Sequence, residues 1–376
     1  MPEITLSNIT KKFGKFTAVE NLNLIINDRS FVTLLGPSGC GKTTTLRMIA
    51  GLESPTEGEI TIGGKLVFSS LKGVDVSPNK RDVGFLFQNY ALWPHMTVEQ
   101  NIAFGLENLK WEKPKIRERV DELLVMLKIE TLGKRFPAEL SGGQQQRVAI
   151  ARTLATKPSV LFMDEPLSNL DAKLRMEMRS ELKRLHMATD STFVYVTHDQ
   201  LEAMTLSTKT CLMKEGVVQQ YAPPLEVYNR PANIFTADFV GNPTMNFIEA
   251  SAKTANAGEI RLEAGGFNLV FTPVSGSLAV RDGQNLTLGI RPEYINIGNE
   301  GTIPAKTYAA LPSGMETIVK IKLGELILTS VVFGAIDYQP DTDIKINFAG
   351  DNCVLFDRES GANLGLGRVK SLDAGA

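Results

Sequence analysis

The chain contains few cysteines, with only three among its 376 residues. Cys40, Cys211 and Cys353 lie far apart in the sequence, and no two of them form a CxxC pair. This spacing, together with their odd number, excludes a disulfide framework of the kind found in small secreted domains. A reducing compartment is therefore expected.

Long apolar segments and an excess of one charge are also missing. The longest apolar run, LILTSVVFGAI, is about half of the ~20 residues that a membrane-spanning helix needs. The N-terminal stretch MPEITLSNITKKFG lacks the apolar core of a signal peptide. Forty basic residues nearly balance forty-two acidic ones, so no general attraction to nucleic acid or anionic lipid is expected. Any role at a membrane must then depend on partner proteins.

The pattern of apolar residues divides the chain near residue 240. Before it, strand candidates at 3–9, 31–36, 160–166 and 193–198 alternate with helical patterns, which is typical of an α/β fold with a largely parallel sheet. After it, short β-like runs such as FNLVF, LTLGIRP, TIVKIKL and DIKINF are separated by turn residues. We therefore predict an α/β domain over 1–240 and a small β-barrel or sandwich over 241–376.

Several helices are expected in the first domain. One helical stretch covers roughly 97–140, where Thr97 and Gln100 fit a capping box and Pro114 suits a first helical turn. Further helices are expected after 141 and across 171–189.

The segment GPSGCGKT fits the phosphate-loop pattern G-x-x-x-x-G-K-[ST]. A buried strand precedes it and a helix follows, as the mechanism requires. Its glycines let backbone N–H groups surround phosphates, Lys42 reaches the β and γ oxygens, and the Thr43 hydroxyl holds Mg²⁺. The predicted nucleotide-binding residues are Gly36, Pro37, Ser38, Gly39, Cys40, Gly41, Lys42, Thr43 and Thr44.

Two strand ends carry candidate catalytic groups. VLFMDEP ends in two carboxylates, of which Asp164 is placed to bind Mg²⁺ and Glu165 to polarise an attacking water. The alternative is a surface acidic pair. His198 ends another apolar strand, where a histidine usually makes structural hydrogen bonds, but ligands bind at the carboxyl edge of such sheets.

LSGGQQQR at 140–147 is a second candidate anion site. Ser141 is a good helix N-cap, and Gly142 and Gly143 leave amide N–H groups uncovered. The alternative is simply a well-capped helix.

Taken in order, GPSGCGKT, Gln88 in FLFQNY, LSGGQQQR, VLFMDEP, SNLD and VTHD resemble the motifs of ABC-transporter ATPase subunits over residues 3 to about 240. The resemblance implies a P-loop cassette with a helical subdomain at about 89–158, using ATP and Mg²⁺. It also implies head-to-tail dimers, in which ATP lies between the phosphate loop of one subunit and the LSGGQ helix of the other. The residues that would serve the opposite subunit's ATP are Ser141, Gly142, Gly143, Gln144 and Asp171.

The same resemblance implies roles for four further residues. Phe13 would stack on adenine, with Phe16 as the less favoured substitute. Gln88 would sense the magnesium ion and the attacking water. Glu165 would be the catalytic base, and His198 would contact the γ-phosphate.

Beyond the cassette, EVYNRPANIFTADFVGNPTMNF and GIRPEYI resemble the importer ATPases for sugars and glycerol phosphates, which carry an OB-like domain called TOBE. This implies two permease subunits, a solute-binding protein, a possible regulatory protein on the C-terminal domain, and a peripheral location on the cytoplasmic face of the cell membrane. The segment 65–82 and STKT at 207–210 depart from the usual pattern. Importers for polyamines, ferric iron or sulfate share much of the layout and remain alternatives.

The apolar segment YALWPHM suggests a docking site for a helix of a membrane subunit, through Tyr90, Leu92, Trp93 and His95. The alternative is a loop tucked into the core. Two other classes of function are weaker. An ATPase acting on nucleic acid lacks a basic stripe here, although OB folds bind oligonucleotides. A purely regulatory protein would not need Glu165 and His198.

Overall fold

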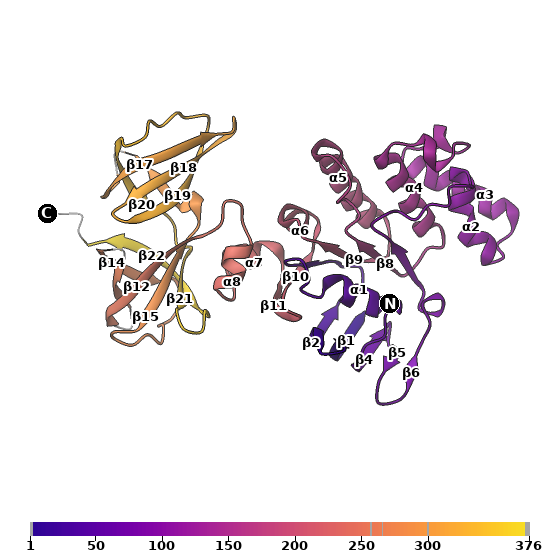
Figure 1. The fold of residues 1–376 in the computed structure, drawn as a ribbon, viewed down its shortest axis with the longest axis horizontal. Helices are drawn as coiled ribbons and strands as arrows, with labels where there is room; N and C mark the ends of the chain where they lie inside the picture. Colours follow the sequence, from indigo (N-terminus) through magenta and orange to yellow (C-terminus); the bar gives the residue numbers. More distant parts are fainter. Residues whose placement is uncertain (1–2, 256–257, 265, 299–300, 373–376) are drawn as a thin grey trace. The chain divides into compact units, whose positions relative to one another are not determined.

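The computed structural model describes residues 3–255, 258–264, 266–298 and 301–372, and it forms two compact units that divide between Pro224 and Leu225 (Figure 1). The sequence pattern placed the division at 240. The reason for the difference lies in two short helices, α7 (Pro224–Asn229) and α8 (Ile234–Phe239), which pack within the C-terminal unit.

Three strands of the N-terminal unit are buried along their whole length, namely β3 (Phe31–Leu35), β8 (Val160–Asp164) and β9 (Thr192–Thr197). Their sequences are continuously apolar because both faces of the sheet are covered. The sheet has the order β11-β10-β3-β9-β8-β7 and is parallel except between β10 and β11. Its other strands are β7 (Val83–Leu86), β10 (Lys209–Lys214) and β11 (Val217–Ala222). The carboxyl ends of β3, β9, β8 and β7 therefore lie side by side.

A second, antiparallel sheet packs with the first around helix α1 (Lys42–Ala50), and apolar side chains from both sheets and the helix share one core. Its order is β2-β1-β4-β5-β6. The predicted strand at 3–9 overlaps β1 from Ile4 onward, but the rest of this sheet was not predicted. Its strands are β1 (Ile4–Phe13), β2 (Phe16–Ile26), β4 (Glu57–Ile62), β5 (Lys65–Ser69) and β6 (Val74–Asp75).

The predicted helical stretch at 97–140 contains two α-helices, which begin at the two predicted helix starts. Helix α2 (Val98–Asn108) begins with the predicted capping box of Thr97 and Gln100, and α3 (Lys113–Met126) has Pro114 in its first turn. Between them Lys110 adopts a positive φ of 56°, which interrupts the helix. The remaining α-helices are α4 (Gly142–Ala155), α5 (Ala172–Ala188) and α6 (Gln200–Leu206).

Helices α2, α3 and α4 gather at one side of the N-terminal unit, away from the antiparallel sheet (Figure 1). Their buried apolar residues form a core of their own that extends to β7, β8 and β9. Short 3-10 helices complete this unit at Pro78–Lys80, Glu130–Leu132 and Pro137–Glu139. Among the residues that the structure describes, every helix is too short or too polar to span a bilayer.

The C-terminal unit is β-rich, as predicted. Six strands close a barrel in the order β12-β13-β14-β22-β21-β15, and five more form a sheet in the order β16-β20-β17-β18-β19. Apolar residues of both contribute to one core. The barrel strands are β12 (Asn246–Ala255), β13 (Ile260–Ala264), β14 (Phe267–Pro273), β15 (Asn285–Ile290), β21 (Cys353–Asp357) and β22 (Asn363–Ser371). The sheet strands are β16 (Ile295–Ile297), β17 (Ile303–Pro312), β18 (Glu316–Leu323), β19 (Leu326–Phe333) and β20 (Asp343–Phe348).

Arg291, at the end of β15, holds α7 and α8 to this unit. Its side chain is 1% exposed and donates hydrogen bonds to the backbone carbonyl oxygens of Tyr228, Ala237 and Val240, at 2.9, 3.0 and 2.5 Å. Its guanidinium also lies 4.0 Å from the centre of the Tyr228 ring. A buried guanidinium satisfied mainly by carbonyl oxygens makes the two helices part of the C-terminal unit.

Candidate active site

The phosphate loop runs from the end of β3 into α1 and needs glycine at Gly41. This residue caps α1 with a φ of 100°, and a Cβ atom placed there would lie 2.5 Å from the carbonyl oxygen of Ala18. Only glycine tolerates both conditions. The loop forms one wall of a pocket of about 300 Å³. The lining residues are Phe13, Phe16, Ala18, Ser38, Gly39, Cys40, Gly41, Lys42, Thr43, Thr44 and Glu165.

Lys42 is folded back over this loop. Its side chain is buried, and Nζ donates to the carbonyl oxygens of Gly36 and Pro37 at 2.7 and 2.9 Å. The ammonium group is thus held beside the amide N–H groups of the loop. Such a concentration of donors and positive charge is the arrangement that binds phosphate oxygens.

Thr43 and Asp164 meet across the carboxyl edge of the sheet. The Thr43 hydroxyl donates to Asp164 Oδ1 at 2.8 Å, and Arg47 Nη2 lies 3.6 Å from Asp164 Oδ2. Burial raises the pKa of the Asp164 carboxyl, while the Thr43 hydrogen bond and the Arg47 charge oppose that shift. Sequence reasoning missed Arg47, although it lies four residues after Thr43 and hence on the same face of α1.

Glu165 and His198 also meet, as the order of β8 and β9 requires. His198 Nδ1 lies 3.3 Å from Glu165 Oε1, and the histidine side chain is 60% exposed. Glu165 has a φ of 45°, a left-handed conformation that is uncommon for a residue with a side chain. Backbone strain of this kind concentrates at functional sites. The carboxylate therefore lies at the pocket with a histidine beside it.

Gln88, after β7, is tied to the loop that follows Glu165. Its Nε2 donates to Ser168 Oγ at 3.4 Å, and its carbonyl oxygen accepts from Asn169 Nδ2 at 3.2 Å. The Ser168 hydroxyl in turn donates to the carbonyl oxygen of Glu165 at 2.8 Å. The structure thus links Gln88 to Glu165 through one residue of the SNLD motif.

The second candidate anion site lies outside the phosphate-loop pocket. Ser141 and Gln144 form a capping box at the start of α4, and Asp171 caps α5 by accepting from the N–H of Leu174 at 3.0 Å. A Cβ atom on Gly143 would lie 2.6 Å from Leu174 Cδ2, so this glycine lets the two helix starts pack together. In the described part of the chain, the phosphate-loop pocket is lined without Ser141, Gln144 or Asp171.

Phe13 and Phe16 face each other across the β1–β2 turn and both line the phosphate-loop pocket. Their exposed fractions are 48% and 61%. Lys11 Nζ lies 4.7 Å from the centre of the Phe13 ring. Either ring is free to stack on a planar base, and stacking at Phe13 stays a prediction.

Comparison with known proteins agrees with this arrangement. Residues 19–168 match the family model of the ABC transporter, and residues 241–295 match that of the MalK OB fold domain. The trehalose/maltose import ATP-binding protein MalK of Thermococcus litoralis is 42% identical over 96% of this chain and 99% of its own length. The osmoprotective compounds uptake ATP-binding protein GgtA of Synechocystis is 42% identical over 95% of each chain.

The chain belongs to the ATP-binding subunits of ABC importers. A solved dimeric ATP-binding cassette in a post-hydrolysis state, bound to ADP and Pi, matches 59% of this chain and 98% of its own, with a TM-score of 0.51 and 35% identity. The predicted fold class, a P-loop cassette followed by an OB-like domain, is confirmed. The predicted ATPase activity is that of this family.

In this ABC subunit the four residues predicted to contact a membrane subunit do not form one surface. Tyr90 is 6% exposed and belongs to the core of the helical subdomain, whereas Leu92 and Trp93 are half-buried and His95 is exposed. The Tyr90 side chain therefore supports the loop from beneath. Arg152 fixes the loop by donating to the carbonyl oxygens of Tyr90 and Ala91 at 2.7 and 2.6 Å.

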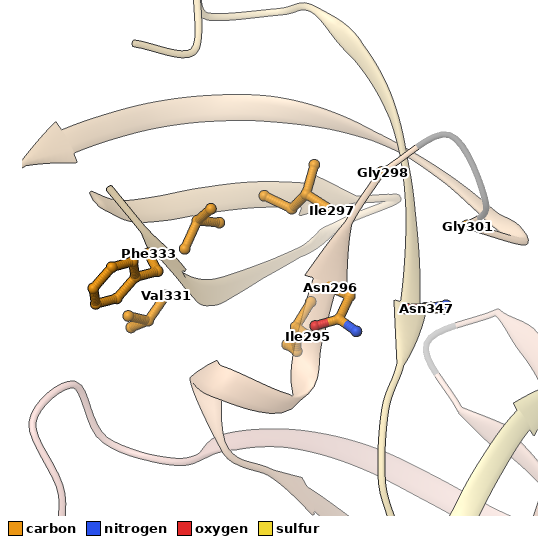
Figure 2. Close-up of a pocket in the computed structure, with 9 residues that line it drawn as sticks. Ile295, Asn296, Ile297, Gly298, Gly301, Val331, Phe333 and Asn347 are labelled. Atoms are coloured by element: carbon orange, nitrogen blue, oxygen red, sulfur yellow. The ribbon is translucent and has the colours of Figure 1, made fainter. Parts of the chain in front are cut away.

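A larger hollow, of about 590 Å³, lies in the C-terminal unit of the ABC subunit between β16 and the end of β19 (Figure 2). Its lining consists of aliphatic, aromatic, glycine and amide residues: Ile295, Asn296, Ile297, Gly298, Gly301, Val331, Val332, Phe333 and Asn347. In the described part of the chain this lining includes no charged side chain, whereas Lys42 and Glu165 line the phosphate-loop pocket.

Glu165→Gln is expected to bind ATP normally and to hydrolyse it at least ~100-fold more slowly, because an amide cannot accept the proton of the attacking water. ATP binding is measured by equilibrium titration and phosphate release by steady-state assay. Glu181 is a buried carboxylate on α5 that is paired with Arg184. Glu181→Gln is therefore the matched control and should retain normal turnover. Near-normal hydrolysis by Glu165→Gln would remove this residue from the role of base.

Proposed function

We propose that this ABC ATPase drives import of a sugar or a glycerol phosphate through two transmembrane permease subunits, on the cytoplasmic face of the membrane. The observation that carries the proposal is similarity to sugar-import subunits along both units of the chain. The maltose/maltodextrin import ATP-binding protein MalK of Yersinia pestis, for example, is 44% identical over 86% of each chain. A match limited to the cassette would support only the ATPase.

The working unit is a head-to-tail dimer of this chain. Each subunit has a phosphate-loop pocket and, elsewhere, an exposed Ser141 and Gly142 at the start of α4. A helix N-terminus carries partial positive charge and free N–H groups, so it attracts the γ-phosphate of ATP held by another subunit. Ser141, Gly142, Gly143, Gln144 and Asp171 would serve that opposite pocket.

Thr43 and Asp164 fit a magnesium ion, because they place a hydroxyl and a carboxylate oxygen 2.8 Å apart at the pocket. Mg²⁺ is usually held by one or two carboxylates together with substrate phosphates, and when bound it neutralises phosphate charge. Gln88, through its contacts with the 165–169 loop, is placed to report on this site. Lys42 and the loop amides hold the phosphates of ATP.

Glu165 orients the attacking water and accepts its proton, while His198 holds the γ-phosphate and the Glu165 carboxylate in one arrangement. ATP binding closes the dimer by completing both pockets, and loss of the γ-phosphate contact reopens it. Closure and reopening would be passed to the permeases through the loop that follows Gln88, where Leu92, Trp93 and His95 remain accessible. Regulation by a protein partner would fall to the C-terminal unit.

Import itself is tested in a strain that lacks its own sugar-import ATPase, supplied with this subunit, its two permeases and its solute-binding protein. Uptake of labelled maltose or trehalose is expected, and Glu165→Gln in the same strain should abolish it. Uptake of labelled spermidine, ferric iron or sulfate without any sugar uptake would overturn the substrate class while leaving the ATPase intact.

The composite site is tested with two inactive variants, Lys42→Ala and Ser141→Arg. Each homodimer should be inactive, because every pocket lacks one half. After mixing and exchange of subunits, hybrid dimers contain one intact pocket, and about a quarter of the wild-type ATPase activity should return. If light scattering and cross-linking show that hybrids have formed but turnover stays at background, the head-to-tail arrangement fails.

Docking of a permease helix is tested by Leu92→Asp and Trp93→Ala. A charge or a cavity in the contact should reduce co-purification of the membrane subunits at least ~10-fold, as expected for losing a central apolar contact. The ATPase activity of the isolated subunit serves as the control and should stay within twofold. Undiminished co-purification of both variants would exclude this loop from the interface.

A further inference from the structure

Glu202, on α6, is a buried carboxylate that the proposed hydrolysis does not use. It is 3% exposed, and its Oε2 accepts hydrogen bonds from the hydroxyls of Tyr195 and Thr197, both at 2.7 Å. Removing such a group from water is unfavourable unless every hydrogen-bonding position is satisfied. The burial of Glu202 beside the end of β9 therefore indicates a specific role for this carboxylate.

The contacts of Glu202 fix the residues on both sides of His198. The Thr197 hydroxyl donates to Glu202 and accepts from the N–H of Asp199 at 2.9 Å. Asp199 then caps α6 by accepting from the N–H groups of Leu201 and Glu202, at 2.8 and 3.2 Å. His198 thus sits between two residues whose positions are set by one buried carboxylate and one helix cap.

Arg175, on α5, joins this cluster to the loop that follows Glu165. Its Nη2 donates to the carbonyl oxygen of Leu170 at 3.1 Å, and its Nη1 lies 3.4 Å from Asp199 Oδ2. Its Nε lies 4.0 Å from Glu202 Oε1. One guanidinium therefore holds the end of the 165–171 loop and the segment that carries His198.

We propose that Glu202 and Arg175 are positioning residues that hold His198 in register with Glu165. Neither touches the phosphate-loop pocket. Both act through the backbone segments that carry Glu165 and His198. Glu202 accepts a hydrogen bond from Thr197 at the end of β9. Arg175, on α5, contacts Leu170 in the loop after Glu165 and Asp199 next to His198. The inference rests on the proposed role of His198 in hydrolysis.

The contacts of Arg175 and Glu202, here called the bridge, also connect the two half-sites proposed for one subunit. Arg175 donates to the carbonyl of Leu170, the residue before Asp171, and Asp171 is proposed to serve the opposite subunit's ATP. His198 serves the subunit's own ATP. A short path of polar contacts therefore connects the segment that ends at Asp171 with the segment that carries His198.

The first test is Glu202→Gln, which keeps the shape of the side chain. The amide oxygen still accepts from Tyr195 and Thr197, but an uncharged NH₂ group now faces Arg175. We expect kcat for ATP hydrolysis to fall about 10-fold, because a small displacement of a positioned group is enough to slow a reaction by that factor. KM for ATP should stay within about threefold, since the phosphate loop is untouched.

Arg175→Lys is the second variant, because an ammonium group cannot reach Leu170 and Asp199 together. It should give the same selective loss of kcat. Glu181→Gln, on α5 and outside the bridge, is the control and should keep kcat within twofold. The proposal would be overturned if Glu202→Gln and Arg175→Lys both kept a normal kcat. It would also be overturned if both variants lost ATP affinity and thermal stability to the same extent as kcat.

A double-mutant cycle separates positioning from a plain structural role. In a His198→Ala background, measured by single-turnover rates with enzyme in excess, Glu202→Gln should lower the rate less than twofold further, because both changes act through one group. A further tenfold loss would overturn the proposal. Near-normal turnover by His198→Ala alone would instead remove the proposed role of His198, and so the two failures are distinguishable.

Discussion

The hydroxyl of Thr43 donates a hydrogen bond to the carboxylate of Asp164, and this contact joins the phosphate loop after β3 to the acidic end of β8, with β9 between the two strands. It forms because β3, β9 and β8 are adjacent and parallel, so that their carboxyl ends meet at one edge. The same adjacency brings Glu165 to His198. The arrangement of the catalytic groups thus depends on strand order, because ligands bind at the carboxyl ends of such parallel strands.

The phosphate loop and the start of α4, the two candidate anion-binding elements, are related in a different way. The phosphate loop supplies glycine-dependent backbone N–H groups and Lys42, whereas α4 supplies a capped helix start held against α5 by the small size of Gly143. Both elements suit phosphate. In the described part of the chain, however, no residue of α4 lines the phosphate-loop pocket. In the proposed head-to-tail dimer, the start of α4 from a second copy adds its partial positive charge to the phosphate-loop pocket.

Hydrogen bonds of polar side chains hold the loops around the site. Gln88, Ser168 and Asn169 secure one end of the loop after Glu165, and Arg175 secures the other. In the C-terminal unit, Arg291 holds α7 and α8 in place in a similar way, by donating to backbone carbonyl oxygens. Ser168, Asn169, Arg175 and Arg291 each donate to a backbone carbonyl oxygen, whereas the Gln88 amide donates to the Ser168 hydroxyl, and all of these bonds are directional. Such contacts therefore specify the path of a loop more closely than apolar packing does.

Local features of the backbone and the chemistry of single segments were predictable from the sequence. The glycines of the phosphate loop, the capping box of Thr97, the N-cap at Ser141 and the β-rich C-terminal part each follow from short-range patterns, because turns, caps and strand alternation depend on near neighbours. Only the tertiary structure decided the antiparallel sheet, the core position of Tyr90, the assignment of α7 and α8 to the C-terminal unit, and the bridge of Arg175 and Glu202. These depend on contacts between segments far apart in the chain, and no periodicity within a segment encodes which distant carbonyl or carboxylate it will meet.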